Sequence, residues 1–197
     1  MRLLLATHND HKRRELQRML TAFPGGEDYE LDMLPDSVEL PPEDGETFAE
    51  NALGKARAAA AVLGRATIAD DSGIAAEALG GAPGVRSARY AGEHATDEQN
   101  LLKLIAEAPP GSGLEYVCVI AYVDPAAGVE RLFEGRCRGL MDPNRRGERG
   151  FGYDPVFVPA DGPQGLTMAE LSDAEKDAIS HRGRAARELL AWLARTG

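Results

Sequence analysis

An apolar run that ends in two adjacent carboxylates is the feature that most constrains this chain. Ile68 and Ala69 precede Asp70 and Asp71, and a serine and a glycine follow. Such a strand end can hold a hard metal ion. Because successive side chains of a strand point to opposite faces, we expect only one of the two acids to face a given site. Asp-Asp-Ser-Gly is equally typical of a turn, so the segment alone leaves both interpretations open.

Length and charge narrow the class of protein. With 197 residues, of which 43% are hydrophobic, the chain can bury a full core and fits one domain, residues 1–197, with room for two lobes. The 22 basic and 32 acidic residues give a net charge of −10, which repels a polyphosphate backbone. We therefore expect no nucleic-acid polymer as partner, although a small anion can still bind in a local basic pocket.

The N-terminal segment and the cysteines indicate a compartment. The apolar start turns polar at Thr7, too early for a signal peptide or a membrane-spanning helix, so we expect a cytoplasmic protein without a membrane partner. Cys118 and Cys137 lack the spacing of a metal site. In a reducing compartment they are expected to be two free thiols.

Helices alternate with strands first, and a pair of strands follows. The pattern predicts strands at 2–6, 66–69, 114–123, 129–137 and 155–158, and helices at 12–20, 47–63, 96–108 and around 186–193. Thr47 and Glu50 form a capping box at the start of the second helix, and residues 124–128 form a hairpin turn. This order predicts an α/β fold with a mixed central sheet flanked by helices.

A polar loop between the first strand and the first helix is a candidate phosphate site. Thr7, Asn9 and Lys12 lie where unpaired backbone N–H groups and the helix dipole favour an anion, and where a lysine adds a point charge. An exposed lysine in an ordinary strand-to-helix loop fits the same residues. Asn51 and Lys55 share one face of the second helix, close in sequence to Glu43, and a polar surface explains them almost as well.

Two segments in the C-terminal third are candidates for binding a base. Phe151 to Asp154 place aromatic rings beside glycine and before a proline, which suits a stacking shelf for a nucleobase. Lys176, His181 and Arg182 offer donors for a carbonyl-bearing ring edge. Phe151 and Tyr153 equally fit core positions. We see no acid and serine arrangement that would make His181 a triad member.

Taken in order, seven short motifs resemble the inosine triphosphate pyrophosphatase (ITPase) family, nearly end to end. They are Thr7-His8-Asn9-Asp10-His11-Lys12, Thr47 to Ala52 with Lys55-Ala56, Ala69 to Gly73, Gly80 to Gly84, Ser87 to Tyr90, Gly150 to Pro155 and Ser180-His181-Arg182. The resemblance implies an enzyme that hydrolyses ITP, dITP and XTP to the monophosphate and pyrophosphate with Mg²⁺ as cofactor. It also implies a homodimer and two lobes with a substrate cleft between them.

The resemblance also implies roles for individual residues. Asp71 is the expected general base and, with Glu43, a magnesium ligand. The residues expected to bind substrate are Thr7, His8, Asn9, Asp10, His11, Lys12, Lys55, Ser72, Phe151, Gly152, Tyr153, Asp154, Lys176, His181 and Arg182.

The chain departs from the family pattern at a few positions. Pro42 precedes Glu43 where the family often has a second acid, which bears on the metal role of Glu43. Arg86 stands where relatives commonly have tyrosine, and Cys137 replaces a more usual aromatic neighbourhood.

Two other functions fit the same residues. One is a related pyrophosphatase that acts on other bases, such as modified pyrimidines. The other is a nucleotide-binding sensor that has lost catalysis, against which the retained Asp70, Asp71, Lys12 and Lys55 speak.

Overall fold

The structure, a computed structural model that describes residues 2–196, contains one mixed sheet with strand order β2-β1-β3-β4-β5-β6. The strands are β1 (Arg2–Leu5), β2 (Glu30–Met33), β3 (Thr67–Ala76), β4 (Gly113–Asp124), β5 (Val129–Met141) and β6 (Phe157–Pro159). The α-helices are α1 (Asp10–Ala22), α2 (Phe48–Leu63), α3 (Asp97–Glu107), α4 (Asp173–Ile179) and α5 (His181–Thr196). Short 3₁₀ segments lie at Glu77–Leu79, Gly84–Arg89 and Asp154–Val156.

The pairing of the strands confirms the expected mixed α/β class. β1 runs parallel to both of its neighbours, with Leu3 opposite Leu31 of β2 and Leu5 opposite Ile68 of β3. β6 runs antiparallel to β5, with Val158 opposite Leu140. No helix among residues 2–196 combines the length and apolarity that crossing a membrane requires.

The described residues form two compact units. The first unit comprises the chain up to Asp71, Cys118–Gly135 and the chain from Arg182 onward, and the second comprises Ser72–Val117 and Arg136–His181. The division falls inside β3, β4 and β5. Whether the chain behaves as one domain with a cleft stays a prediction.

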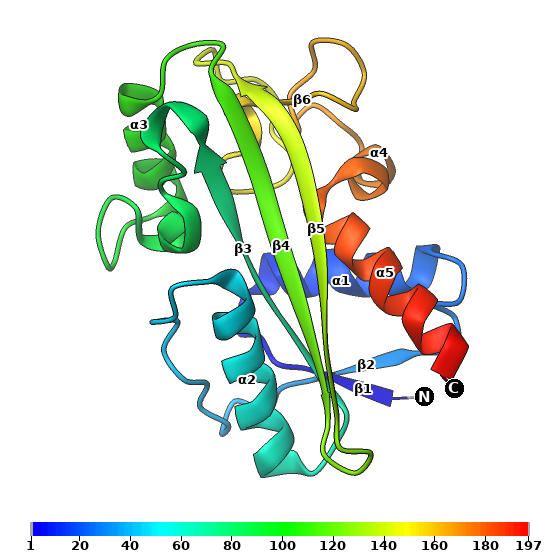
Figure 1. Cartoon of the computed structure of the whole chain (residues 1–197). Helices are drawn as coiled ribbons and strands as arrows, with labels where there is room; N and C mark the ends of the chain where they lie inside the picture. The colour runs from blue at the N-terminus through cyan, green and yellow to red at the C-terminus, as the bar shows by residue number, and fades with distance from the viewer. Residues whose placement is uncertain (1, 197) are drawn as a thin grey trace. The chain divides into compact units, whose positions relative to one another are not determined.

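The first unit has two hydrophobic clusters, because alternate residues of its strands point to opposite faces. Leu3 and Leu5 of β1 pack with Leu16 and Met19 of α1 and with Leu189 of α5. Leu4 and Ala6 pack instead with the alanine-rich face of α2, which contributes Ala52, Ala56, Ala59 and Ala60. Figure 1 shows α2 on one side of the β1 and β2 strands and α1 with α5 on the other. Small alanines let α2 pack closely against the sheet.

Local signals explain where α2 begins and ends. The Thr47 hydroxyl accepts a hydrogen bond from the Glu50 amide at 3.1 Å, and the Glu50 carboxylate accepts one from the Thr47 amide. This capping box satisfies N–H groups that would otherwise lack partners. Gly64 ends the helix in a left-handed conformation with φ of 64°, which glycine adopts without strain. The predicted helix is confirmed to within a residue.

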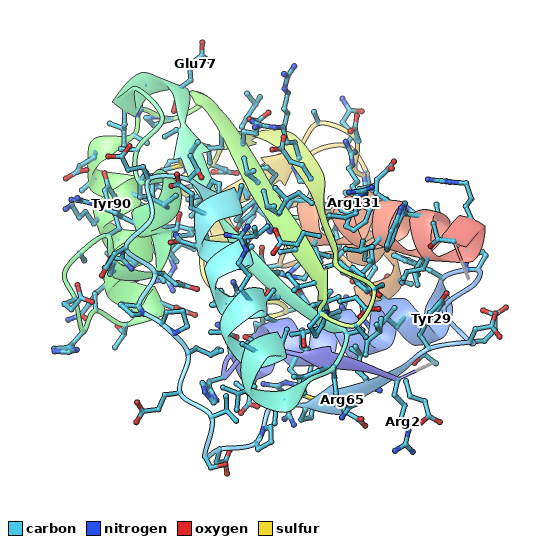
Figure 2. All side chains as sticks on the ribbon, turned by 60° about the horizontal axis from the view of Figure 1, so that its bottom comes forward. Arg2, Tyr29, Arg65, Glu77, Tyr90 and Arg131 are labelled. Atoms are coloured by element: carbon cyan, nitrogen blue, oxygen red, sulfur yellow. The ribbon has the colours of Figure 1, made fainter. Side chains whose placement is uncertain are left out.

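The second unit has a single cluster that holds the glycine-rich segment in place. Leu101 and Leu104 of α3 pack with Ile74, Tyr116 and the aromatic ring of Phe157, among others. The glycine-rich segment 80–92 contains one 3₁₀ stretch, Gly84–Arg89, and its Ser87 hydroxyl accepts a hydrogen bond from the Ile74 amide of this core at 2.8 Å. Tyr90, labelled in Figure 2, donates its hydroxyl to Glu107 of α3, and Lys103 of the same helix lies 4.4 Å from its ring centroid.

The predicted elements differ from the structure in several places. The strand predicted at 66–69 does not end before Asp70, and Asp-Asp-Ser-Gly is not a turn, because β3 runs from Thr67 to Ala76. Ile74 and Ala76 are fully buried, and that burial outweighs the turn preference of the polar residues before them. β2 and α4 were not predicted. β2 alternates polar and apolar residues over only four positions, the shortest run in which a period-2 pattern indicates a strand.

A buried ion network joins three elements of the first unit. At the start of α5 the Arg182 guanidinium, whose side chain is 1% exposed, pairs with Glu15 of α1 and with Asp70 of β3. Its Nη2 lies 3.1 Å from Asp70 Oδ2, and Lys12 Nζ lies 3.3 Å from the same oxygen. Four buried charges thus offset one another, since two are acidic and two basic. Removing one partner leaves an uncompensated charge in the core.

We predict that Arg182→Ala lowers the free energy of unfolding by about 3–5 kcal/mol, because Glu15 and Asp70 stay buried without their shared cation. Chemical denaturation measures the loss. As a control, Arg57→Ala removes an Arg–Glu130 pair that is exposed on both sides, and its effect should be small. A loss below about 1 kcal/mol for Arg182→Ala would show that the network does not stabilise the unit.

Candidate active site

Asp71 lies on the face of β3 that meets α2. Its side chain is 4% exposed, and its Oδ2 accepts a hydrogen bond from Asn51 Nδ2 at 2.9 Å. Asp70, its neighbour, points the other way, into the network with Arg182 and Lys12. The expectation that the two acids face opposite sides is confirmed.

Glu43 and Lys55 lie beside this acid in the first unit. Lys55 Nζ pairs with Glu43 Oε1 and donates to the backbone carbonyl of Asp70 at 2.6 Å. Lys55 is buried on the inner face of α2, whereas Glu43 is half-buried in the loop that precedes the helix. The polar-surface interpretation of Asn51 and Lys55 is therefore wrong, because each residue is only 5% exposed.

The two adjacent acids differ in electrostatics. Burial opposes the ionisation of Asp70, but the cations of Lys12 and Arg182 outweigh it and hold the pKa of that carboxyl well below its usual value. Burial raises the pKa of Asp71; Lys12 partly offsets this rise, and the Glu43 carboxylate adds to it. A carboxylate with a raised pKa is a better proton acceptor than an ordinary one, which suits a general base.

The loop between β1 and α1 is only partly what the sequence predicted. Asn9 caps α1, and its Oδ1 accepts from the amides of His11 and Lys12 at 2.9 and 3.1 Å. These two N–H groups already have a partner, so fewer unpaired amides are left to bind an anion than the sequence predicted. Lys12 is not an exposed lysine: its side chain is 12% exposed. Burial opposes the charged form of Lys12, but the Asp70 carboxylate favours it, and the pKa of Lys12 is raised.

Other members of this loop differ in exposure. Thr7 is buried, and its hydroxyl accepts from the Asn9 amide at 3.2 Å. His8, Asp10 and His11 are exposed. Thr7 and Lys12 therefore lie at the inner end of the loop.

The two acids of this group fit a divalent cation that takes its other ligands from water or substrate. Asp71 and Glu43 offer carboxylate oxygens. Burial raises the pKa of Asp71 and repulsion by Glu43 adds to the rise, and a divalent cation would relieve that repulsion. Within residues 2–196 no group of three or more His, Cys, Asp or Glu side chains is placed to hold a metal ion. Mg²⁺ commonly binds one or two carboxylates and completes its shell with water and substrate phosphates.

The second unit contains a separate group centred on Asp154. Its Oδ2 accepts from the Phe151 amide at 2.9 Å and from Lys176 Nζ at 2.6 Å, and its Oδ1 accepts from the Tyr116 hydroxyl at 3.1 Å. Lys176 Nζ also lies 5.1 Å from the centroid of the Phe151 ring. Asp154 thereby fixes both the backbone that carries Phe151 and the ammonium beside its ring.

The aromatic residues of this group have different surroundings. Phe151 is half-buried, whereas Tyr153 is 6% exposed, packs in the core and donates its hydroxyl to the Ser87 carbonyl at 2.7 Å. Tyr153 thus occupies the core position that the sequence left open for it, and its contact with a base stays a prediction. Gly152 and Ser72 are half-buried.

His181 and Arg182 are adjacent in sequence but have different partners. The His181 ring stacks on Tyr116 in the second unit, with centroids 4.6 Å apart and planes at 7°. Arg182 belongs to the first unit and pairs there with Glu15 and Asp70. A contact between Arg182 and a substrate base stays a prediction.

The sequence analysis missed two contributors to these groups, Glu15 and Tyr116. Glu15 and Asp70 hold Arg182, and Tyr116 holds Asp154 and His181. Glu15 did carry a signal, because it lies three residues after Lys12 on the core-facing side of α1, beside Leu16. Tyr116 carried none, because an aromatic residue inside an apolar strand is an ordinary core residue.

Comparison with known proteins identifies the family of the chain. The model of the Ham1 family matches residues 3–192. A dITP/XTP pyrophosphatase of Frankia alni is 50% identical, with 98% of this chain and 97% of the relative covered. A protein of the same name from Corynebacterium glutamicum is 48% identical over the same shares.

Solved structures give the same result. The Staphylococcus aureus Ham1 protein matches with a TM-score of 0.84 and 36% identity, and all of both chains is covered. A HAM1 protein from Coxiella burnetii matches with a TM-score of 0.83 and 38% identity over 99% of each chain. The match of family model, relatives and fold spans almost the whole sequence, and the chain belongs to the Ham1 family, the family of the dITP/XTP pyrophosphatases it resembles.

Proposed function

We propose that this protein hydrolyses the non-standard purine nucleotides ITP, dITP and XTP to the monophosphate and pyrophosphate, with Mg²⁺ as cofactor. The observation that carries the proposal is the buried Asp71, which is held by Asn51 and lies in the charge field of Glu43, Lys12 and Lys55. An acid in this setting suits activation of water beside a highly charged phosphate chain. The names of the relatives in Frankia and Corynebacterium support the substrate class.

The first unit supplies the groups for the phosphate chemistry. Asp71, whose carboxylate Asn51 holds in place, accepts the proton of the attacking water. Lys12 and Lys55 offset negative charge that develops on the pyrophosphate leaving group. Asp71 and Glu43 would hold the Mg²⁺ ion, which supplies charge neutralisation on the phosphate oxygens when bound. Thr7 and Asn9 shape the loop that carries Lys12.

The second unit supplies groups suited to a purine ring. Phe151 offers a half-buried aromatic face, and Lys176 presents donors beside it. Hypoxanthine and xanthine carry an acceptor at position 6, which such donors can bind, whereas adenine carries an amino group there. An amino group facing the Lys176 ammonium would set donor against donor, which disfavours ATP. Guanine shares the acceptor, so this contact does not exclude GTP.

We also propose that the protein is a homodimer and that it acts in the cytoplasm. The family resemblance supports a homodimer, which light scattering on the purified protein tests directly. Cys118 and Cys137 are buried and not disulfide-bonded, which fits a reducing cytoplasm, where nucleotide pools are found.

We predict that the purified protein converts ITP, dITP and XTP far faster than ATP or dUTP, and that the first products are monophosphate and pyrophosphate. EDTA should abolish the activity and Mg²⁺ should restore it. Ca²⁺ should restore little, because it prefers longer bonds and more ligands. Chromatography of the products with the five substrates is the measurement. Preference for dUTP would favour the pyrimidine alternative, and release of orthophosphate with diphosphate would contradict the proposed cut.

We predict that Asp71→Asn folds normally and lowers kcat by about 10²-fold or more, a scale typical of losing a general base or a metal-held charge. The amide keeps the shape of the side chain and can still accept from Asn51. Asp32→Asn, which changes a surface acid paired with Arg65, is the matched control and should keep wild-type kcat. If Asp71→Asn retained more than about half of wild-type kcat at saturating Mg²⁺, its assignment would be wrong.

A further inference from the structure

Asn51 is a buried polar residue on an otherwise apolar helix face. The face of α2 that packs on the sheet carries alanines, yet Asn51 and Lys55 interrupt it one turn apart, and each is 5% exposed. Burying an amide is unfavourable unless its donor and acceptor both find partners. The partners of Asn51 therefore indicate why the residue is there.

Both ends of the Asn51 amide are used. Nδ2 donates to Asp71 Oδ2 at 2.9 Å, and Oδ1 accepts from the Gly45 amide at 2.8 Å. These partners fix the orientation of the amide, because a flip would bring its oxygen against the Asp71 carboxylate and its NH₂ against the Gly45 N–H. One side chain thus links β3 to the loop that carries Glu43.

Gly45 permits this link. A Cβ atom at position 45 would lie 2.7 Å from Asn51 Oδ1 and 2.9 Å from Glu50 Cβ, closer than real side chains approach. Glu43 lies only two residues before Gly45, so the position of the Gly45 backbone limits where the Glu43 carboxylate can reach. Lys55 makes a second link between the same parts, because it pairs with Glu43 and donates to the Asp70 carbonyl.

We propose that Asn51 is a positioning residue that sets the distance between the Asp71 and Glu43 carboxylates, and thereby the affinity of the site for a divalent cation. This inference rests on the proposed function, in which these two acids hold Mg²⁺. Asn51 bonds Asp71 through a neutral donor. A lysine or arginine at position 51 would also bind Asp71 but would repel the cation, whereas an amide orients the acid and leaves its charge available.

The central test is Asn51→Ala, with metal binding measured apart from catalysis. Binding of Mn²⁺ alone is followed by the loss of the free-ion electron paramagnetic resonance signal. We expect binding to weaken by about 10-fold or more, the usual effect of losing a residue that orients a metal ligand. The Mg²⁺ concentration for half-maximal ITP hydrolysis should rise by a similar factor, and KM for ITP at saturating Mg²⁺ should change by less than about twofold.

A second variant keeps the inference testable if Asn51→Ala folds poorly. Gly45→Ala introduces the close contact with Asn51 Oδ1 and displaces the loop while Asn51 and Asp71 stay in place. It should also weaken Mn²⁺ binding. Hydrogen exchange at residues 43–47 should be faster in both variants than in the wild type, because the Gly45 amide loses its acceptor.

Asn100→Ala is the matched control. Asn100 is equally buried in the second unit, accepts from the Ala91 amide at 2.8 Å and donates to the Ala88 carbonyl at 3.0 Å. Asn100→Ala should lower the stability of the protein about as much as Asn51→Ala does, but it should leave Mn²⁺ binding unchanged.

The outcomes separate the two proposals. If the wild type releases pyrophosphate and binds Mn²⁺ but Asn51→Ala binds Mn²⁺ equally well, the positioning role is wrong and the proposed function stands. If Mn²⁺ binding weakened equally in Asn51→Ala and Asn100→Ala, the positioning role would also be wrong, because general destabilisation would explain both results. A wild type that neither binds Mn²⁺ nor releases pyrophosphate would overturn the proposed function and this inference together.

Discussion

The pairing of the buried Asp70 carboxylate with Arg182 and Lys12 is the interaction on which the first unit depends. Asp70 is fully buried in the middle of β3, and without cations its ionised form would be strongly disfavoured. Arg182 brings the start of α5 to it and Lys12 brings α1, while Glu15 balances the second positive charge. The network therefore sets the positions of Lys12 and of the backbone next to Asp71.

The two neighbouring acids of β3 show how one strand can serve structure and chemistry at once. Because the strand alternates, Asp70 faces the charged network of α1 and α5, whereas Asp71 faces Asn51 of α2. Their pKa values move in opposite directions for that reason: cations lower that of Asp70, and burial with the Glu43 carboxylate raises that of Asp71. An acid that its cations hold in the ionised form thus lies next to one whose surroundings suit proton exchange.

The sequence predicted elements whose signals are local and missed contacts that are distant. The helix after Thr47 was predicted almost to its ends, because its capping box and alanines lie within the segment itself. The length of β3 was not predicted, because Asp70 to Gly73 favour a turn by themselves and are kept extended by the neighbouring strands. The partners of Arg182 lie 112 and 167 residues away, so its burial between two acids left no local trace. Asn51 was noticed by spacing alone.

The central claim is that the acid and cations of the first unit direct water to the α-phosphorus of the substrate. Hydrolysis of ITP in water enriched in ¹⁸O, with mass spectrometry of both products, tests it most directly. The account predicts that each turnover places one heavy oxygen in the inosine monophosphate and none in the pyrophosphate. Heavy oxygen in the pyrophosphate would show attack at the β-phosphorus instead, and would contradict the proposed roles of Asp71, Lys12 and Lys55.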